Sequence, residues 1–188
     1  LTLNTDERGL VDAAALGQLI DDDVVLLSVM LANNEIGTVQ PISELGRTVQ
    51  RVRLQRLKKG NKTPFFLHTD ACQAPCYLSV EPHRLGVDLM TLNGGKIYGP
   101  KNVGVLYVAG NVNLAPQILG GGQQRGLRSG SETVAPVLGM AMAIEKAGED
   151  RKSAGRQIAE VRDHMKARLF QAVPQVIFNG SFKKRLPN

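Results

Sequence analysis

Two side chains suited to cofactor chemistry, Asp70 and Lys96, each follow a short apolar run of the sequence. Apolar runs that end in polar residues are typical of buried parallel strands where they leave a sheet. Ligands of open α/β sheets bind beyond those carboxyl ends, so we expect Asp70 and Lys96 to face one ligand at one edge of a sheet. Such a site suits a lysine that forms a Schiff base and a carboxylate that holds a pyridinium nitrogen.

The elements that must position these residues alternate between strand and helix. Apolar runs predict strands at 24–31, 65–68, 87–92 and 103–108, and the first of them is expected to be buried. A short helix is expected before residue 20, and a longer one after Pro41, where apolar residues recur at helical spacing. This alternation favours an α/β fold with a mostly parallel sheet and flanking helices.

The last third of the sequence is predicted to be mainly helical. We expect one helix over 133–148 and a second, strongly amphipathic one after 153, followed by a short strand at 176–178. The charged stretch 148–153 between the two helices is the weak boundary of the chain. The predicted division is therefore a first domain over 1–150 and a remainder over 151–188.

Four stretches of the sequence, in this order, resemble the cysteine desulfurase and selenocysteine lyase family of the class V aminotransferase group. They are M-L-A-N-N-E-I-G-T-V-Q-P at 30–41, H-T-D-A-C-Q at 68–73, K-I-Y-G-P-K-N-V-G-V-L-Y-V at 96–108 and G-G-G-Q-Q-R-G-L-R-S-G-S-E at 120–132. The resemblance implies that 1–150 is the cofactor-binding large domain of a fold-type I pyridoxal-phosphate transferase, incomplete at its N-terminus. It implies that 151–188 holds the connecting helix and the start of a truncated small domain.

The same resemblance implies roles for individual residues around pyridoxal 5'-phosphate. Lys96 would form the Schiff base and move protons, and Asp70 would hold the ring nitrogen. Gln73 would bond the phenolic oxygen of the cofactor, and Asn34 would contact the cofactor. Ser131 would reach the phosphate bound by a neighbouring subunit, which implies a homodimer. From the residues alone, Asp70 and Gln73 also suit a strand-end turn, and Lys96 suits a surface turn.

The sequence also departs from the family pattern. Asn93 stands where a serine is common and Gly95 where a histidine is usual, and both positions help to hold the cofactor phosphate in the family. We do not find the family's N-terminal phosphate loop, its histidine that stacks on the ring, or its sulfur-accepting cysteine, and so we expect a partial chain. Cys72 and Cys76 are expected to be inert core thiols, because free cysteine is commonly buried.

The resemblance implies an enzyme that removes sulfur or selenium from cysteine or selenocysteine and leaves alanine, with a possible sulfur or selenium acceptor protein. The two cysteines, which we expect to be reduced, favour a cytoplasmic location. Two alternatives stay open: a class V aminotransferase-like enzyme of different specificity, and a non-catalytic, truncated or decayed relative that serves as a scaffold. In the 120–132 loop, the two arginines and two serines suit either anion binding or a structural role.

Composition excludes several other classes of protein. The 188 residues carry a formal charge of +6, but much of the excess is one local cluster, which we expect to be a solvated helix face. It comprises Arg47, Arg51, Arg53, Arg56, Lys58, Lys59 and Lys62. Aromatic residues make up 4% and no nucleic-acid motif is present, so nucleic-acid binding is disfavoured. No apolar run is long enough to span a membrane, and the histidines and cysteines lack a zinc spacing.

Overall fold

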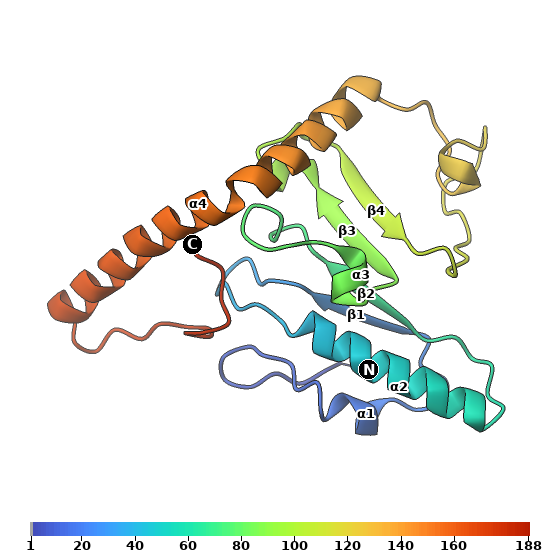
Figure 1. The fold of residues 1–188 in the computed structure, drawn as a ribbon, viewed down its shortest axis with the longest axis horizontal. Helices are drawn as coiled ribbons and strands as arrows, with labels where there is room; N and C mark the ends of the chain where they lie inside the picture. Colours follow the sequence, from blue (N-terminus) through green and yellow to red (C-terminus); the bar gives the residue numbers. More distant parts are fainter. Residues whose placement is uncertain (1) are drawn as a thin grey trace.

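A four-stranded sheet organises the chain, of which the computed structural model describes residues 2–188. The strands are ordered β1-β2-β3-β4, with β1 to β3 parallel and β4 antiparallel to β3 (Figure 1). Their bounds are Leu26–Met30, Phe66–Asp70, Leu89–Asn93 and Gly104–Val108. The predicted mostly parallel α/β sheet is confirmed, and the four predicted strands are all present with shifted ends.

Within the described part of the chain, four helices accompany the sheet. Their bounds are Leu16–Leu19 (α1), Ile42–Lys58 (α2), Pro82–Leu85 (α3) and Val134–Ala172 (α4), and two 3-10 turns lie at Gly94–Lys96 (η1) and Gln124–Gly126 (η2). Pro41 precedes the first residue of α2, as its fixed backbone angle favours. In the part of the chain that the structure describes, no helix is long and apolar enough to cross a membrane.

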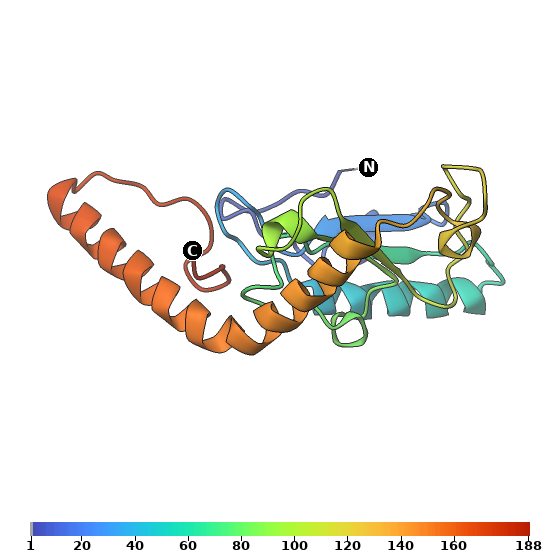
Figure 2. The same ribbon diagram turned by 90° about the horizontal axis from the view of Figure 1, so that it is seen from above.

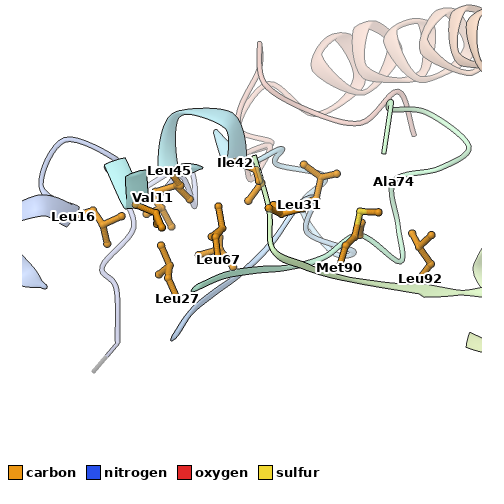
Figure 3. Close-up of a cluster of buried hydrophobic side chains, with 14 of the residues drawn as sticks. Val11, Leu16, Leu27, Leu31, Ile42, Leu45, Leu67, Ala74, Met90 and Leu92 are labelled. Atoms are coloured by element: carbon orange, nitrogen blue, oxygen red, sulfur yellow. The ribbon is translucent and has the colours of Figure 1, made fainter. Parts of the chain in front are cut away.

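The core lies between α2 and one face of the sheet (Figure 3). Leu45 and Val49 of α2 face Leu27, Leu67 and other side chains that alternate along the strands. The opposite face of β1 is exposed at every second residue, so the prediction that 24–31 is a wholly buried strand is wrong. A strand packed on one face only buries alternate residues, and no helix covers this second face of the sheet in the region described.

The cationic cluster of α2 is only partly a solvated surface. Arg56 is 2% exposed and donates to the carbonyl oxygens of Asp21 and Val24 at 2.7 and 2.8 Å. Arg53 pairs with the buried carboxylate of Asp88, which also accepts from the Leu67 backbone N–H. The solvated-face prediction is therefore wrong for these two arginines, because their heads satisfy buried carbonyls and a buried charge.

Helix α4 is one continuous helix, so the prediction of two helices separated near 148–153 is wrong. No proline lies within that stretch, and the charged residues there are compatible with an exposed helix face. Figure 2 shows α4 extending away from the sheet before the chain returns. The division at residue 150 stays a prediction. The predicted strand at 176–178 is also wrong: Ile177 is exposed, and Phe178 packs on Phe170 with ring centroids 4.9 Å apart.

The returning C-terminal segment pairs with the loop that follows β1. Val39 donates its backbone N–H to the Lys184 carbonyl oxygen at 2.8 Å, and Leu186 donates to the Gly37 carbonyl oxygen at 2.8 Å. The buried hydroxyl of Thr38 accepts from the Ser181 N–H at 3.0 Å. We call residues 180–187 the C-terminal clasp, since this segment fixes the loop over 33–40.

Candidate cofactor site at the strand ends

Asp70 and Lys96 lie at the same edge of the sheet. Asp70 is the last residue of β2 and pairs in register with Thr91 of β3, which runs parallel to β2. Strand β3 ends two residues later at Asn93, and the η1 turn then carries Lys96. The carboxylate and the amine therefore both follow carboxyl ends of neighbouring parallel strands, which is where open α/β sheets bind ligands.

The turn that presents Lys96 is built by Asn93 and Gly94. The Asn93 Oδ1 atom accepts the Gly95 N–H at 2.8 Å, which caps the turn. A Cβ atom on Gly94 would lie 2.7 Å from both the Pro100 carbonyl oxygen and Val103 Cγ1, so only glycine allows this close backbone approach. Lys96 itself is exposed at the start of the loop to β4.

Packing does not require a glycine at position 95. Its φ is not positive, and a Cβ atom there would meet only Asn93 Oδ1 at 3.3 Å and Lys101 Cγ at 4.0 Å. The space next to Lys96 would thus admit a side chain with a small adjustment of Asn93. The backbone of this turn is therefore not what excludes the histidine that the family resemblance implies at position 95.

Asp70 keeps part of its hydrogen-bonding capacity. Its Oδ1 atom accepts the Cys72 N–H at 2.9 Å, which is the strand-end turn that the sequence left open as an alternative. Within residues 2–188, no hydrogen bond engages its Oδ2 atom, and the side chain is exposed. The carboxylate can therefore order the turn with one oxygen and bind a ligand with the other.

The Cys72 thiol lies in the electrostatic field of both site residues. Burial, the interaction of the thiol with the Asp70 side chain and the negative charge of Asp70 raise the pKa of the Cys72 thiol to about 12, although the positive charge of Lys96 opposes them. Burial also raises the pKa of the Cys76 thiol. Both cysteines are free and half-buried, and their thiols stay protonated at neutral pH, as expected for inert thiols.

The Asn34 loop is ordered by its neighbour Asn33. The Asn33 Oδ1 atom accepts the N–H groups of Glu35 and Ile36 at 2.9 and 3.0 Å. The Glu35 side chain is exposed, and only its backbone N–H takes part in the ordering of this loop. Asn34 is exposed after the end of β1, beside β2, and stays a predicted cofactor ligand.

Gln73 and Ser131 differ in how the structure places them. Gln73 is half-buried in the turn directly after Asp70, closed by the Ala74 N–H to the Ala71 carbonyl oxygen at 2.9 Å. Ser131 is exposed and follows β4, which is antiparallel and so leaves the sheet at the edge opposite Lys96. Gln73 thus lies next to Asp70 in the same turn, whereas Ser131 lies in the segment between β4 and α4 and stays a predicted ligand.

The 120–132 loop is organised by its own polar groups. Buried Ser129 accepts the Gly122 N–H through its hydroxyl at 3.2 Å, and the Gln123 Oε1 atom accepts the Gly130 N–H at 3.1 Å. Arg128 donates to the Ser129 carbonyl oxygen at 2.8 Å, which gives it a structural role. Arg125 is exposed.

A polar row that the sequence did not single out crosses three strands beside Asp70. Ser28 Oγ lies 2.8 Å from His68 Nδ1, and His68 Nε2 lies 3.2 Å from Thr91 Oγ1. His68 and Asp70 alternate along β2 and therefore share one face of the sheet. The alternation places them together, but the row itself depends on the register of three strands. Across residues 2–188, no cluster of three or more His, Cys, Asp or Glu residues suits a metal ion.

The family model described as "Aminotransferase class-V" matches residues 2–187. The chain belongs to this family. Curated relatives include cysteine desulfurase IscS of Clostridium botulinum, 35% identical over 188 residues, and cysteine desulfurase IscS of Dictyoglomus turgidum, 36% identical over 186 residues. Each match covers 99% of this chain but only 45% and 44% of the relative. The chain thus spans about half the length of these relatives.

Solved structures of related proteins share the fold. A NifS-like protein superposes with a TM-score of 0.88 at 34% identity, over 100% of this chain and 48% of its own. A NifS-like protein from Rickettsia africae ESF-5 superposes with a TM-score of 0.87 at 27% identity, over 99% of this chain and 49% of its own. The chain therefore has the architecture of about half of a NifS-like protein.

Proposed function

We propose that this chain forms the cofactor-binding part of a pyridoxal-phosphate-dependent cysteine desulfurase, which removes sulfur from cysteine and leaves alanine. The observation that carries the proposal is the convergence of Asp70 and Lys96 at the ends of two neighbouring parallel strands. The names of the relatives, which are cysteine desulfurases, support the choice among class V activities.

The donor set of this edge fits the reactive half of pyridoxal phosphate. Asp70 offers an unengaged carboxylate oxygen for a protonated ring nitrogen, and Lys96 offers an exposed primary amine for an aldehyde. Gln73 would face the ring oxygen, and Asn34 would contact the ring from the neighbouring strand. The phosphate would have Asn93 nearby on this chain, with Ser131 supplied by a second copy in a homodimer.

The roles of the protein residues follow from this arrangement. The bound cofactor would supply an electron-withdrawing ring, which Asp70 keeps effective by holding the ring nitrogen protonated. Lys96 Nζ would hold the cofactor and then carry protons to and from the reacting carbon. The C–S bond of the substrate would break as an acceptor thiolate takes the sulfur, which forms an S–S bond and releases alanine.

The acceptor thiolate would come from another segment or another protein. Cys72 and Cys76 are poor candidates because both thiols have raised pKa values and lie in the turn after β2. Selenocysteine would undergo the same bond cleavage, so a selenocysteine lyase is the closely related substrate alternative. Reduced thiols in the region described are consistent with the cytoplasmic location that we propose.

A second candidate is a non-catalytic, truncated or decayed relative that serves as a scaffold, which the exposed alternate residues of β1 and the glycine at position 95 favour. Trapping of bound cofactor distinguishes the two proposals. The chain is incubated with pyridoxal phosphate, reduced with borohydride and mapped by peptide mass spectrometry. A cofactor site predicts labelling of Lys96 in excess of Lys101, an exposed lysine of the same loop. A scaffold predicts equal, weak labelling of both lysines.

Matched variants sharpen this test. Asp70→Asn should lower the labelling of Lys96 and leave that of Lys101 unchanged, because only Lys96 shares a ligand with Asp70. In a polypeptide of the relatives' full length, Lys101→Ala should not alter visible absorbance, whereas Lys96→Ala should abolish it. Labelling of Lys96 that is insensitive to Asp70→Asn would refute the proposed site.

We expect the 188 residues alone to retain little cofactor and to release no alanine from cysteine. These residues do not include the family's N-terminal phosphate loop, and Gly95 stands where the family has a histidine that helps to hold the phosphate. If two or three charge-assisted hydrogen bonds to the cofactor are missing for these reasons, at about 1.5–3 kcal/mol each, binding is weaker by several powers of ten. A polypeptide of the relatives' full length should restore both colour and alanine release. Alanine produced by the 188 residues alone would make Cys72 or Cys76 the sulfur acceptor.

A further inference from the structure

His68 uses both of its ring nitrogens within the polar row Ser28–His68–Thr91. The row joins β1, β2 and β3 on the sheet face that no helix covers. The hydroxyl groups of Ser28 and Thr91 can each donate or accept, so an imidazole with a single N–H is fully satisfied between them. The imidazole is therefore fixed in place without needing a charge.

The surroundings of His68 contain one nearby charge. Its own strand supplies Asp70, two residues away on the same face, while β1 and β3 present the uncharged hydroxyls of Ser28 and Thr91. The Cys72 thiol, in the turn after β2, is also uncharged at neutral pH. Burial lowers the pKa of His68, and the negative charge of Asp70 only partly opposes this. Among residues 2–188, Asp70 is thus the charge that favours an imidazolium here.

We propose that His68 is a positioning residue, which Ser28 and Thr91 hold neutral so that the neighbouring Asp70 carboxylate stays free for a cationic ring nitrogen. This inference rests on the proposed function, because it concerns the ligand of Asp70. An imidazolium at position 68 would compete for the same carboxylate and would repel a cationic ring. A neutral imidazole removes both effects while it still ties the three strands together.

The direction in which cofactor affinity changes with pH follows from the charges of His68, Asp70 and the cofactor ring. A cation bound to Asp70 cancels the charge that favours protonation of His68, so cofactor binding lowers the His68 pKa further. Binding then expels a proton from His68 whenever that proton is present. Affinity should fall as pH falls through the His68 pKa of the free protein, by up to about tenfold per pH unit below it.

The first test uses the protein without cofactor. Histidine ring signals are titrated by NMR, with His83 and His164 as internal references. We expect the His68 midpoint below the ordinary value of about 6.5, and we expect Asp70→Asn to lower it further by removing the favourable charge. Glu44→Gln, an exposed change on α2, should leave the midpoint unchanged. A midpoint at or above the ordinary value, or one insensitive to Asp70→Asn, overturns the proposal.

The second test measures pyridoxal phosphate affinity from pH 8 to pH 5.5, with the native chain and with His68→Gln. The amide retains hydrogen bonding but does not titrate, and the ionisations of the cofactor itself are common to both proteins. We expect the native chain to lose affinity more steeply than the variant as pH falls. A purely structural His68 predicts the same fold-loss for the variant at every pH, which would overturn the proposal. Because the 188 residues are expected to bind weakly, both proteins are titrated to the solubility limit of pyridoxal phosphate. If neither protein shows even weak cofactor binding there at any pH, the proposed function fails, and the NMR titration alone decides the state of His68.

Discussion

At the scale of single residues, the site depends on how the Asp70 carboxylate acts on two neighbours, His68 and Cys72. Asp70 orders its own turn through Oδ1, raises the pKa of Cys72 and opposes the lowering of the pKa of His68. Lys96 acts on the Cys72 thiol in the opposite direction to Asp70. A substitution of Asp70 should therefore change the ionisation of both neighbours as well as any ligand binding.

Cys72 should react slowly with alkylating agents in the folded chain. At pH 8, a thiol with a pKa of about 12 is deprotonated in about one molecule in ten thousand, against about a quarter for an ordinary thiol of pKa about 8.5. We expect iodoacetamide to modify Cys72 at least about a hundredfold more slowly than glutathione. Peptide mapping separates Cys72 from Cys76, and unfolding in urea is the control that should restore ordinary reactivity. Fast alkylation of the folded chain would reopen Cys72 as a sulfur acceptor.

The sequence predicted Asp70 and Lys96 at one sheet edge because both follow apolar runs, and the parallel register confirms this placement. It did not predict the row Ser28–His68–Thr91, because residues 40 and 23 positions apart meet only through strand register. The role of Asn33 was missed for a different reason. Either member of an Asn-Asn pair can form a loop turn, and only the fold decides which one does.

At the scale of elements, α2 is the helix that fixes the sheet to its supporting loops. Four carbonyl oxygens accept from Arg56, at Asp21, Val24, Thr63 and Pro64. Its guanidinium also lies over the Phe65 ring, 5.1 Å from the centroid. A single buried side chain thus joins the segment before β1 to the segment before β2.

Replacement of Arg56 should destabilise the fold without touching the candidate site. Arg56→Met leaves several buried carbonyls unpaired, which we expect to lower the free energy of unfolding by about 2–4 kcal/mol. Arg47→Met, an exposed change on the same helix, should alter it by less than about 0.5 kcal/mol. Urea unfolding monitored by circular dichroism measures both. Equal stability of the two variants would show that the buried network contributes nothing net.

The ends of helices and strands could be predicted from the sequence where the local pattern is strong and the contacts made in the folded chain agree with it. The helix after Pro41 follows from its apolar spacing, and the structure confirms it as α2. The break within α4 and the strand at 176–178 were wrong for one shared reason. Each was suggested by a local pattern alone. The charged residues at 148–153 suggested a helix boundary, but they are compatible with the exposed surface of one helix. The apolar run at 176–178 suggested a strand, but within the described residues no other strand pairs with it.

At the scale of the whole molecule, two apolar surfaces remain exposed in the region described. One is the sheet face that bears Leu26, Met30 and Leu106, and the other runs along α4. On α4, Leu138 is 60% exposed and Met142 is 70% exposed. Contiguous exposed apolar surface of this kind marks contact sites.

We expect the isolated chain to self-associate through α4. Leu138→Lys combined with Met142→Lys should shift its sedimentation coefficient toward that of a monomer, because two charges would have to be buried on contact. Gln157→Lys adds charge at an exposed polar position of the same helix and should have little effect. A native chain that sediments as a monomer at working concentration would contradict this expectation.

The C-terminal clasp has a consequence for the order of folding. The clasp joins Ser181 to Thr38, which are 143 residues apart in a chain of 188, so the contact closes a very long loop. The entropy cost of closure grows with loop length, and contacts of such long range tend to form after local ones. The segment over 33–40 should therefore become ordered late, after β1 and α2 on either side of it. Asn34 would then be among the last site residues to reach its position, and amide exchange in this loop should report opening of the clasp before global unfolding.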